Sequence, residues 1–151
     1  MKGFNLRVYA LIINEFNEIL ISDEYRFGQF FTKFPGGGVE QKEGIKTALF
    51  RELQEELGLV VDDARFFYFN DFHQESAFDQ SNLVAFYYIV ALPKRAFKAE
   101  EAYNIPFAIE QEKQRWEKLE TFHPSSLTFP IDKIVLEKLK ADFTFENLPL
   151  Q

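Results

Sequence analysis

One stretch of 23 residues constrains this chain more than any other, because it places four glutamates and one arginine at fixed spacings. It runs Gly37-x5-Glu43-x7-Arg51-Glu52-Leu53-x-Glu55-Glu56-x-Gly58-Leu59. Glu52, Glu55 and Glu56 share one arc of a helix, because residues three and four apart are neighbours on a helical surface. Like charges at this spacing destabilise an isolated helix by roughly 0.2–0.5 kcal/mol per pair. The pattern therefore predicts a bound cation, and a hard divalent ion such as Mg²⁺ suits carboxylate oxygens.

A solvated acidic helix face is the simpler alternative, and two features of the sequence weigh against it. Lys46 is the only lysine between Gly44 and Leu59, so the glutamates lack partners for i,i+4 ion pairs. The helix is preceded by the run Phe34-Pro35-Gly36-Gly37-Gly38, for which we expect a tight loop. Glycines in such a loop let the backbone approach a ligand closely.

The motif resembles the Nudix box, G-x5-E-x7-R-E-U-x-E-E-x-G-U, where U is a bulky aliphatic residue, and every specified position matches. The resemblance implies an α/β fold, an α/β/α sandwich with a mixed, mostly antiparallel and partly parallel β-sheet between helices. It also implies a divalent-metal-dependent hydrolase that cleaves a diphosphate linkage in a nucleoside diphosphate derivative by metal-activated water. Mg²⁺ is the expected cofactor, with Mn²⁺ as a substitute.

The resemblance assigns roles to residues of the box. The metal ligands it implies are the carboxylates of Glu52, Glu55 and Glu56 and the backbone carbonyl of Gly36. Glu52 and Glu55 are expected to be catalytic, and so are Arg51 and Glu43, as an ion pair that fixes the loop and orients a ligand carboxylate. Gly37 and Gly38 are expected to contact the substrate.

A general base outside the box is typical of many family members, which carry an acidic residue in a loop shortly before a Trp-containing strand. Trp116 marks that strand here. Glu112 lies four residues before it and is the favoured base, with Glu110 as the second candidate. A solvated loop glutamate is the alternative for either residue.

Other substrate contacts are suggested by weaker signals. Asp132, at the start of the last helix, matches a place where relatives of the MutT type read a base edge, although an acid in a first helical turn is also favoured by the helix dipole. Lys33 and Arg26 are candidate phosphate contacts, with ordinary surface residues as the alternative. His73 could polarise a phosphate or sugar, or be a structural residue at a strand end.

Regular elements alternate along the chain as an α/β fold requires. We expect strands at residues 4–14, 18–22, 30–34, 64–72, 83–92 and 114–119, and helices at 45–57 and 130–141. Residues 45, 49, 53 and 57 should form the apolar stripe of the first helix, and residues 131, 134, 135 and 139 that of the second. Residues 123–127 read as a turn, and the pattern assigns nothing to residues 93–111.

Bulk properties set the remaining expectations. A chain of 151 residues suits a single domain over 1–151. The absence of cysteine, of a signal-peptide pattern and of an apolar run of about 20 residues favours a cytoplasmic protein without membrane contact. The net charge of -7 disfavours broad nucleic-acid binding, so the expected partner is a small nucleotide, and a homodimer stays open.

Two other classes of function compete with the hydrolase. One is a non-catalytic nucleotide- or metabolite-sensing domain, against which the intact acidic cluster argues. The other is a structural interaction domain, which would leave the unpaired glutamates unexplained. Within the hydrolase class, the substrate stays open among oxidised nucleoside triphosphates, nucleotide sugars and dinucleoside polyphosphates.

Overall fold

The computed structural model describes residues 3–143, and the chain forms two units. Unit 1 takes in Met1–Leu11 and Gly36–Val90, and unit 2 takes in Ile12–Pro35 and Ala91–Gln151. The Nudix-box residues lie in unit 1, and the residues around Trp116 lie in unit 2. The single domain predicted for the whole chain stays a prediction.

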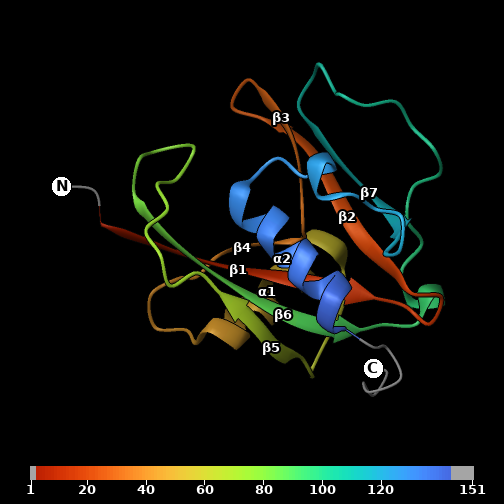
Figure 1. Ribbon diagram of the computed structural model, residues 1–151, viewed down its shortest axis with the longest axis horizontal. Coiled ribbons are helices and arrows are strands. Elements are labelled where there is room, and N and C mark those ends of the chain that lie inside the picture. Colours follow the sequence, from red (N-terminus) through yellow and green to blue (C-terminus); the bar gives the residue numbers. More distant parts are fainter. Residues whose placement is uncertain (1–2, 144–151) are drawn as a thin grey trace. The chain divides into compact units, whose positions relative to one another are not determined.

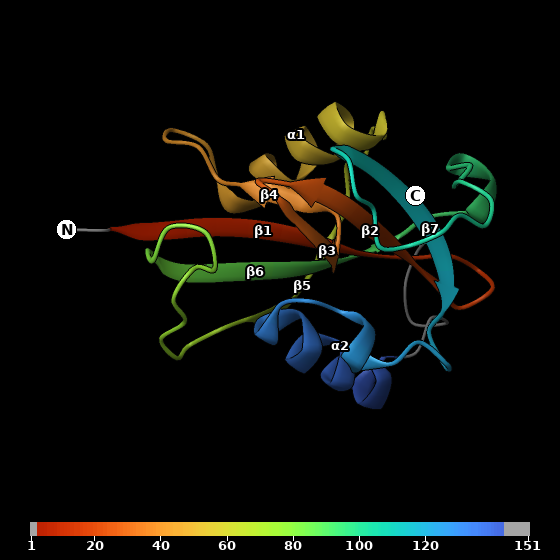
Figure 2. The same cartoon turned by 90° about the horizontal axis from the view of Figure 1, so that it is seen from above.

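Unit 1 contains four strands, of which three are successive neighbours in the sheet, and one helix; Figure 1 labels these elements. Its elements are β1 (Phe4–Ile13), β4 (Gly36–Gly38), α1 (Ile45–Leu57), β5 (Arg65–Phe69) and β6 (Asn82–Ala91). The strand order is β1-β6-β5, so β6 is central, as its nearly continuous apolar run predicts. The short β4 pairs with β1, and Figure 2 shows α1 next to β4.

The helix α1 has the predicted bounds, and its sequence explains both its packing and its end. Ala48, Leu49 and Leu53 are fully buried, whereas Ile45 and Leu57 at the two ends of the predicted stripe are only half-buried. Gly58 ends the helix in the left-handed conformation, with φ of 67°, and its N–H donates to the carbonyl of Gln54. Glycine adopts this conformation without the steric penalty of a Cβ.

The glycine run before α1 is a strand, not the tight loop that its composition predicts. Gly36, Gly37 and Gly38 form β4, antiparallel to β1, in register with Tyr9, Val8 and Arg7 respectively. A Cβ at Gly36 would lie 2.1 Å from the carbonyl oxygen of Val8, and its φ is 148°. This position therefore needs glycine because another backbone approaches it, which composition alone does not reveal.

Unit 2 contains three antiparallel strands, the second helix and two short 3-10 helices (Figure 1). Its elements are β2 (Glu18–Arg26), β3 (Gln29–Lys33), η1 (Lys94–Ala96), β7 (Gln111–Lys118), η2 (Pro124–Ser126) and α2 (Pro130–Asp142). β2 pairs with β3 and with β7, and β7 is paired with β2 along the whole of its length. β7 begins three residues earlier than predicted, so Glu112 lies within a strand and the expectation that it lies in a loop is wrong.

The segment that the sequence pattern left unassigned follows β7 along part of its path. The indole N–H of Trp116 donates to the carbonyl of Phe97 at 3.3 Å, and the N–H of Glu100 donates to the carbonyl of Gln114 at 3.1 Å. Side-chain-to-backbone and backbone bonds of this kind leave no periodic trace in the sequence. The segment is thus held by β7 without forming a regular element beyond η1.

The buried face of α2 lacks one predicted residue and includes two others. Ile131, Asp132, Val135, Leu136 and Leu139 are buried, but Ile134 is 40% exposed. Asp132 and Leu136 are four residues apart and lie on one side of the row formed by Ile131, Val135 and Leu139, whereas Ile134 lies on the other side of that row. Across residues 3–143, neither helix has the length and apolar character that a membrane crossing requires.

Candidate active site

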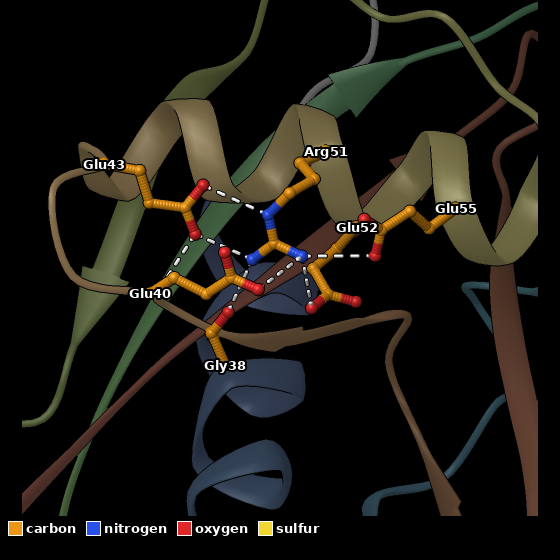
Figure 3. Close-up of polar contacts among 6 residues, drawn as sticks. All are labelled: Gly38, Glu40, Glu43, Arg51, Glu52 and Glu55. Atoms are coloured by element: carbon orange, nitrogen blue, oxygen red, sulfur yellow. Dashed lines mark hydrogen bonds and ion pairs between the residues drawn. The ribbon is translucent and has the colours of Figure 1, made fainter.

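Arg51 is the centre of a polar network that joins α1 to the segment before it (Figure 3). Its Nε donates to Oε2 of Glu43 at 3.0 Å, and its Nη2 donates to Oε1 of the same carboxylate at 2.7 Å. Nη2 also donates to the carbonyl oxygen of Gly38 at 3.0 Å. This bidentate pair lowers the pKa of Glu43, with help from the N–H of Glu40, which donates to Oε1 at 2.8 Å. The ion pair expected between Arg51 and Glu43 is present.

The remaining nitrogen of Arg51 contacts the acidic arc of α1. Nη1 lies 3.1 Å from Oε1 of Glu52 and 3.2 Å from Oε2 of Glu55, with Glu40 at 3.8 Å. The hydrogen bonds to Glu43 and Glu52 outweigh burial and raise the pKa of Arg51. One guanidinium thus contacts carboxylates of α1 that the sequence pattern leaves without a cation, although its single charge cannot balance all of them.

Glu52 packs against the backbone of β4. A Cβ at Gly37 would lie 2.5 Å from Cδ of Glu52 and 2.6 Å from each of its carboxylate oxygens. Gly37 therefore makes room for a side chain of α1 rather than for a ligand alone. The carboxylate is fixed from two sides, by this surface and by Arg51.

Arg7 on β1 is a cation of unit 1 that the sequence reasoning missed. Its Nε donates to the hydroxyl of Tyr9 at 3.1 Å. Burial opposes its charge, but Tyr9 and the carboxylates of Glu52 and Glu56 outweigh burial and raise the pKa of Arg7. A single charge within the otherwise apolar run from residue 6 to residue 13 was the available signal.

Unit 2 contains a second acidic pair, which includes the predicted base. Glu112 on β7 stands directly opposite Glu24 on β2, and the side chain of Glu24 is only 5% exposed. Burial, followed by the negative charge of Glu24, raises the pKa of Glu112. Arg26 lies 3.6 Å from Oε1 of Glu112, and Gln114 donates to its Oε2 at 3.1 Å. A carboxyl group with a raised pKa has the property that a proton acceptor requires.

The other candidates of unit 2 are found in contrasting surroundings. Lys33 is buried, and its Nζ lies 3.3 Å from Oε2 of Glu24 and donates to the carbonyl of Phe34 at 3.1 Å. Asp132 is 2% exposed, unlike the usual solvated acid of a first helical turn. Glu110 is exposed just before β7. His73, in unit 1, is also exposed and lies outside the helices and strands.

Comparison with known proteins identifies the family. The NUDIX domain model matches residues 3–139. The chain belongs to the Nudix hydrolase family. An RNA pyrophosphohydrolase from Actinobacillus pleuropneumoniae serotype 3 is 31% identical over 125 residues, which are 83% of this chain and 52% of that protein. A second, from Haemophilus ducreyi, is 41% identical over 63 residues, which are 42% of this chain and 31% of that protein. The chain thus spans about half the length, or less, of these curated relatives.

Solved structures confirm the predicted Nudix fold, a mixed β-sheet with two helices. A structure from work on MutT of Aliivibrio salmonicida and Vibrio cholerae has a TM-score of 0.65 and 27% identity, and it covers 93% of this chain and 99% of that one. The MutT protein of Methanosarcina mazei Go1 has a TM-score of 0.67 at 21% identity and covers 93% of this chain and 95% of that one. Membership of the Nudix family follows from the match of the domain model, which takes in most of the chain.

The expected metal ligands of the Nudix box match a divalent ion by their chemistry, but two of their three carboxylates bond to Arg51. The side chains of Glu52, Glu55 and Glu56 offer only oxygen donors, as Mg²⁺ prefers. Within residues 3–143, no three histidine, cysteine or acidic side chains are arranged to hold a metal ion. Glu52 and Glu55 instead bond to Nη1 of Arg51. The donor set fits the ion, and the ion would have to compete with Arg51 for two of the three carboxylates.

Proposed function

We propose that this Nudix protein is a divalent-metal-dependent hydrolase that cleaves a diphosphate linkage in a nucleoside diphosphate derivative. The observation that supports the proposal most strongly is the acidic cluster around Arg51, which brings together three of the four glutamates of the box, Glu43, Glu52 and Glu55. A bound divalent ion would lower the pKa of a water molecule and offset the charge that develops on the phosphate.

The protein's own residues have separate tasks in this proposal. The carboxylates of Glu52, Glu55 and Glu56 and the carbonyl of Gly36 would hold the ion. Arg51 and Glu43 hold α1 against the segment that precedes it, since one guanidinium bonds to Glu43, to Gly38 and to two carboxylates of the helix.

The general base is proposed separately, because it lies outside the box. The pKa of Glu112 is raised above the ordinary value of a glutamate by burial and by Glu24, which is the direction that favours a proton acceptor, and Glu110 is the alternative.

The substrate class is proposed from the relatives and from the charge of the chain. RNA pyrophosphohydrolases are among the matched proteins, so RNA joins the oxidised nucleoside triphosphates, nucleotide sugars and dinucleoside polyphosphates as a candidate. The net charge of -7 opposes extended contact with a nucleic-acid backbone. We therefore propose a small nucleotide, or at most the terminal nucleotides of an RNA, as the bound group.

A hydrolysis panel tests this function directly. Each candidate is incubated with Mg²⁺-loaded protein, with protein treated with chelator, and with Glu56→Gln, and the products are identified by mass. We expect hydrolysis of at least one class with Mg²⁺, none after chelation, and a loss of orders of magnitude in Glu56→Gln, which keeps the side-chain shape but removes one ligand charge. If the loaded protein binds nucleotides and cleaves none of them, the non-catalytic sensing domain replaces the hydrolase.

A further inference from the structure

Arg7 has unused hydrogen-bonding capacity beside the acidic cluster of unit 1. Its Nε is taken by the hydroxyl of Tyr9 at 3.1 Å, and its Cζ lies 5.8 Å from the centre of the Tyr9 ring. In the part of the chain that the structure describes, Nη1 and Nη2 make no hydrogen bond and no ion pair. A guanidinium carries five N–H donors, so four of them are left to a partner outside these residues.

The position of this guanidinium is set by two neighbouring glycines of β4. A Cβ at Gly37 would meet the carboxylate of Glu52 at 2.5–2.6 Å, and a Cβ at Gly38 would meet Nη1 of Arg7 at 3.4 Å. Arg7 is directly opposite Gly38 in the β1–β4 register. The half-buried fork of Arg7 and the carboxylate of Glu52 thus lie over consecutive residues of one short strand.

A role as counter-ion for the glutamates explains this arrangement poorly. Arg51 already bonds to Glu52 and Glu55 at 3.1 and 3.2 Å, and to Glu43 at 2.7 Å. Arg7 comes near enough for the charges of Glu52 and Glu56 to raise its pKa, yet it forms an ion pair with neither. The guanidinium of Arg7 lies near these carboxylates without bonding to them, and its two Nη atoms form the forked pair of donors that binds phosphate oxygens.

We propose that Arg7 is a substrate-binding residue, whose Nη1 and Nη2 donate hydrogen bonds to phosphate oxygens of the diphosphate substrate. The proposal rests on the proposed function, since it places the substrate's phosphates beside the carboxylates that would hold the metal. Tyr9 then has a positioning role, because its hydroxyl fixes Nε and leaves the opposite side of the fork open.

Metal binding and phosphate binding respond in opposite directions to loss of this cation. When the positive charge of Arg7 is removed, its electrostatic repulsion of a divalent ion near Glu52 and Glu56 is lost, so the affinity for the metal should stay the same or rise. Removing two charge-assisted hydrogen bonds to phosphate should weaken phosphate binding. A residue that only organised the carboxylates would lower both affinities when replaced.

The test measures these two affinities in Arg7→Gln and Arg7→Lys, with Arg65→Gln as the matched control. Arg65 is an exposed arginine on β5 of the same unit, and within residues 3–143 its side chain makes no hydrogen bond and no ion pair. Mn²⁺ binding to the substrate-free protein is followed by electron paramagnetic resonance. Binding of imidodiphosphate, an analogue that resists hydrolysis, is followed by calorimetry in the presence of Mn²⁺, and thermal unfolding confirms that each variant folds.

We expect Arg7→Gln to bind Mn²⁺ at least as tightly as the wild type and imidodiphosphate about 10-fold to 100-fold more weakly. Arg7→Lys should recover part of the loss, because an ammonium retains the charge but not the fork. Arg65→Gln should match the wild type in both affinities. With a cleavable substrate, the KM of Arg7→Gln should rise more than its kcat falls.

Three outcomes would overturn the proposal. Unchanged imidodiphosphate affinity in Arg7→Gln removes Arg7 from the substrate site while leaving the hydrolase intact. A parallel loss of Mn²⁺ and imidodiphosphate affinity, with Arg7→Lys unable to restore either, makes Arg7 an organiser of the carboxylates. If the wild type itself binds Mn²⁺ but no imidodiphosphate, the proposed function fails together with this assignment.

Discussion

Replacing Gly37 with alanine should damage the chemistry while leaving the fold nearly intact. The new Cβ would lie 2.5 Å from Cδ of Glu52, whereas carbon atoms in ordinary contact are about 3.5–4.0 Å apart. The carboxylate must therefore move by about 1 Å. Because the displaced atoms end a flexible side chain, the free energy of unfolding should fall by only about 1 kcal/mol, at the low end for overpacking.

The cost should appear in turnover instead. A displacement of about 1 Å in a catalytic constellation lowers the rate by about 10²-fold. We would measure kcat at saturating Mg²⁺ on a substrate from the panel, and stability by urea unfolding of the same preparations.

The neighbouring glycines provide matched controls. Gly36→Ala should fail to fold or lose several kcal/mol, because its Cβ would lie 2.1 Å from the backbone oxygen of Val8 and no side-chain motion relieves that contact. Gly38→Ala meets only the end of Arg7, at 3.4 Å, so it should keep stability close to wild type and affect KM, through the proposed phosphate contact of Arg7, more than kcat. Wild-type kcat in Gly37→Ala, or an equal loss in Gly38→Ala, would refute the assignment of Glu52 to the reaction centre.

Two further variants test the charges of each unit. Arg51→Lys keeps one positive charge but cannot bond bidentately to Glu43 and also reach Gly38. Urea unfolding should therefore show that the free energy of unfolding falls by about 1–2 kcal/mol, and turnover should be reduced. An unchanged free energy of unfolding would contradict the stabilising role of the network. Glu112→Gln removes the repulsion with Glu24 directly across β2 and β7 and should raise stability by about 0.5–1 kcal/mol at pH 8, while lowering kcat about 10²-fold to 10⁴-fold if Glu112 is the base. Because the folded state raises the pKa of Glu112, it binds that proton more tightly than the unfolded chain, and wild-type stability falls as pH rises from the ordinary glutamate pKa through the raised one. The stability gain of Glu112→Gln should therefore vanish at acidic pH, and a gain independent of pH would show that the raised pKa is not its source.

The helix of the box could be predicted because its signals are local. The apolar spacing through Leu49 and Leu53 sets its buried face, and Gly58 sets its end, so the predicted bounds match those of α1. The charge network was only partly foreseen. The pair of Arg51 with Glu43 follows from the motif, but the turn of Glu52 and Glu55 toward the same guanidinium depends on side-chain geometry.

Two features could not be predicted from the sequence, β4 and the position of Glu112 within a strand, because both depend on which distant segments pair with each other. β4 exists because three glycines lie against β1, a partner about 28 residues earlier in the chain, and glycine runs ordinarily indicate loops. A loop is expected at Glu112 because many family members carry an acidic residue in a loop shortly before a Trp-containing strand, which Trp116 marks here. The pairing of Glu112 with Glu24 supplies the strand, and no periodicity reports such a pairing.

The bond between the indole of Trp116 and the carbonyl of Phe97 has a spectroscopic consequence. Trp116 is the only tryptophan of the chain, and it lies on β7 in unit 2. Its emission therefore reports on unit 2 alone, whereas far-ultraviolet circular dichroism sums α1 of unit 1 and α2 of unit 2. Urea curves from the two signals that coincide mean that the units unfold in one cooperative step, and curves that separate mean that each unit has a stability of its own.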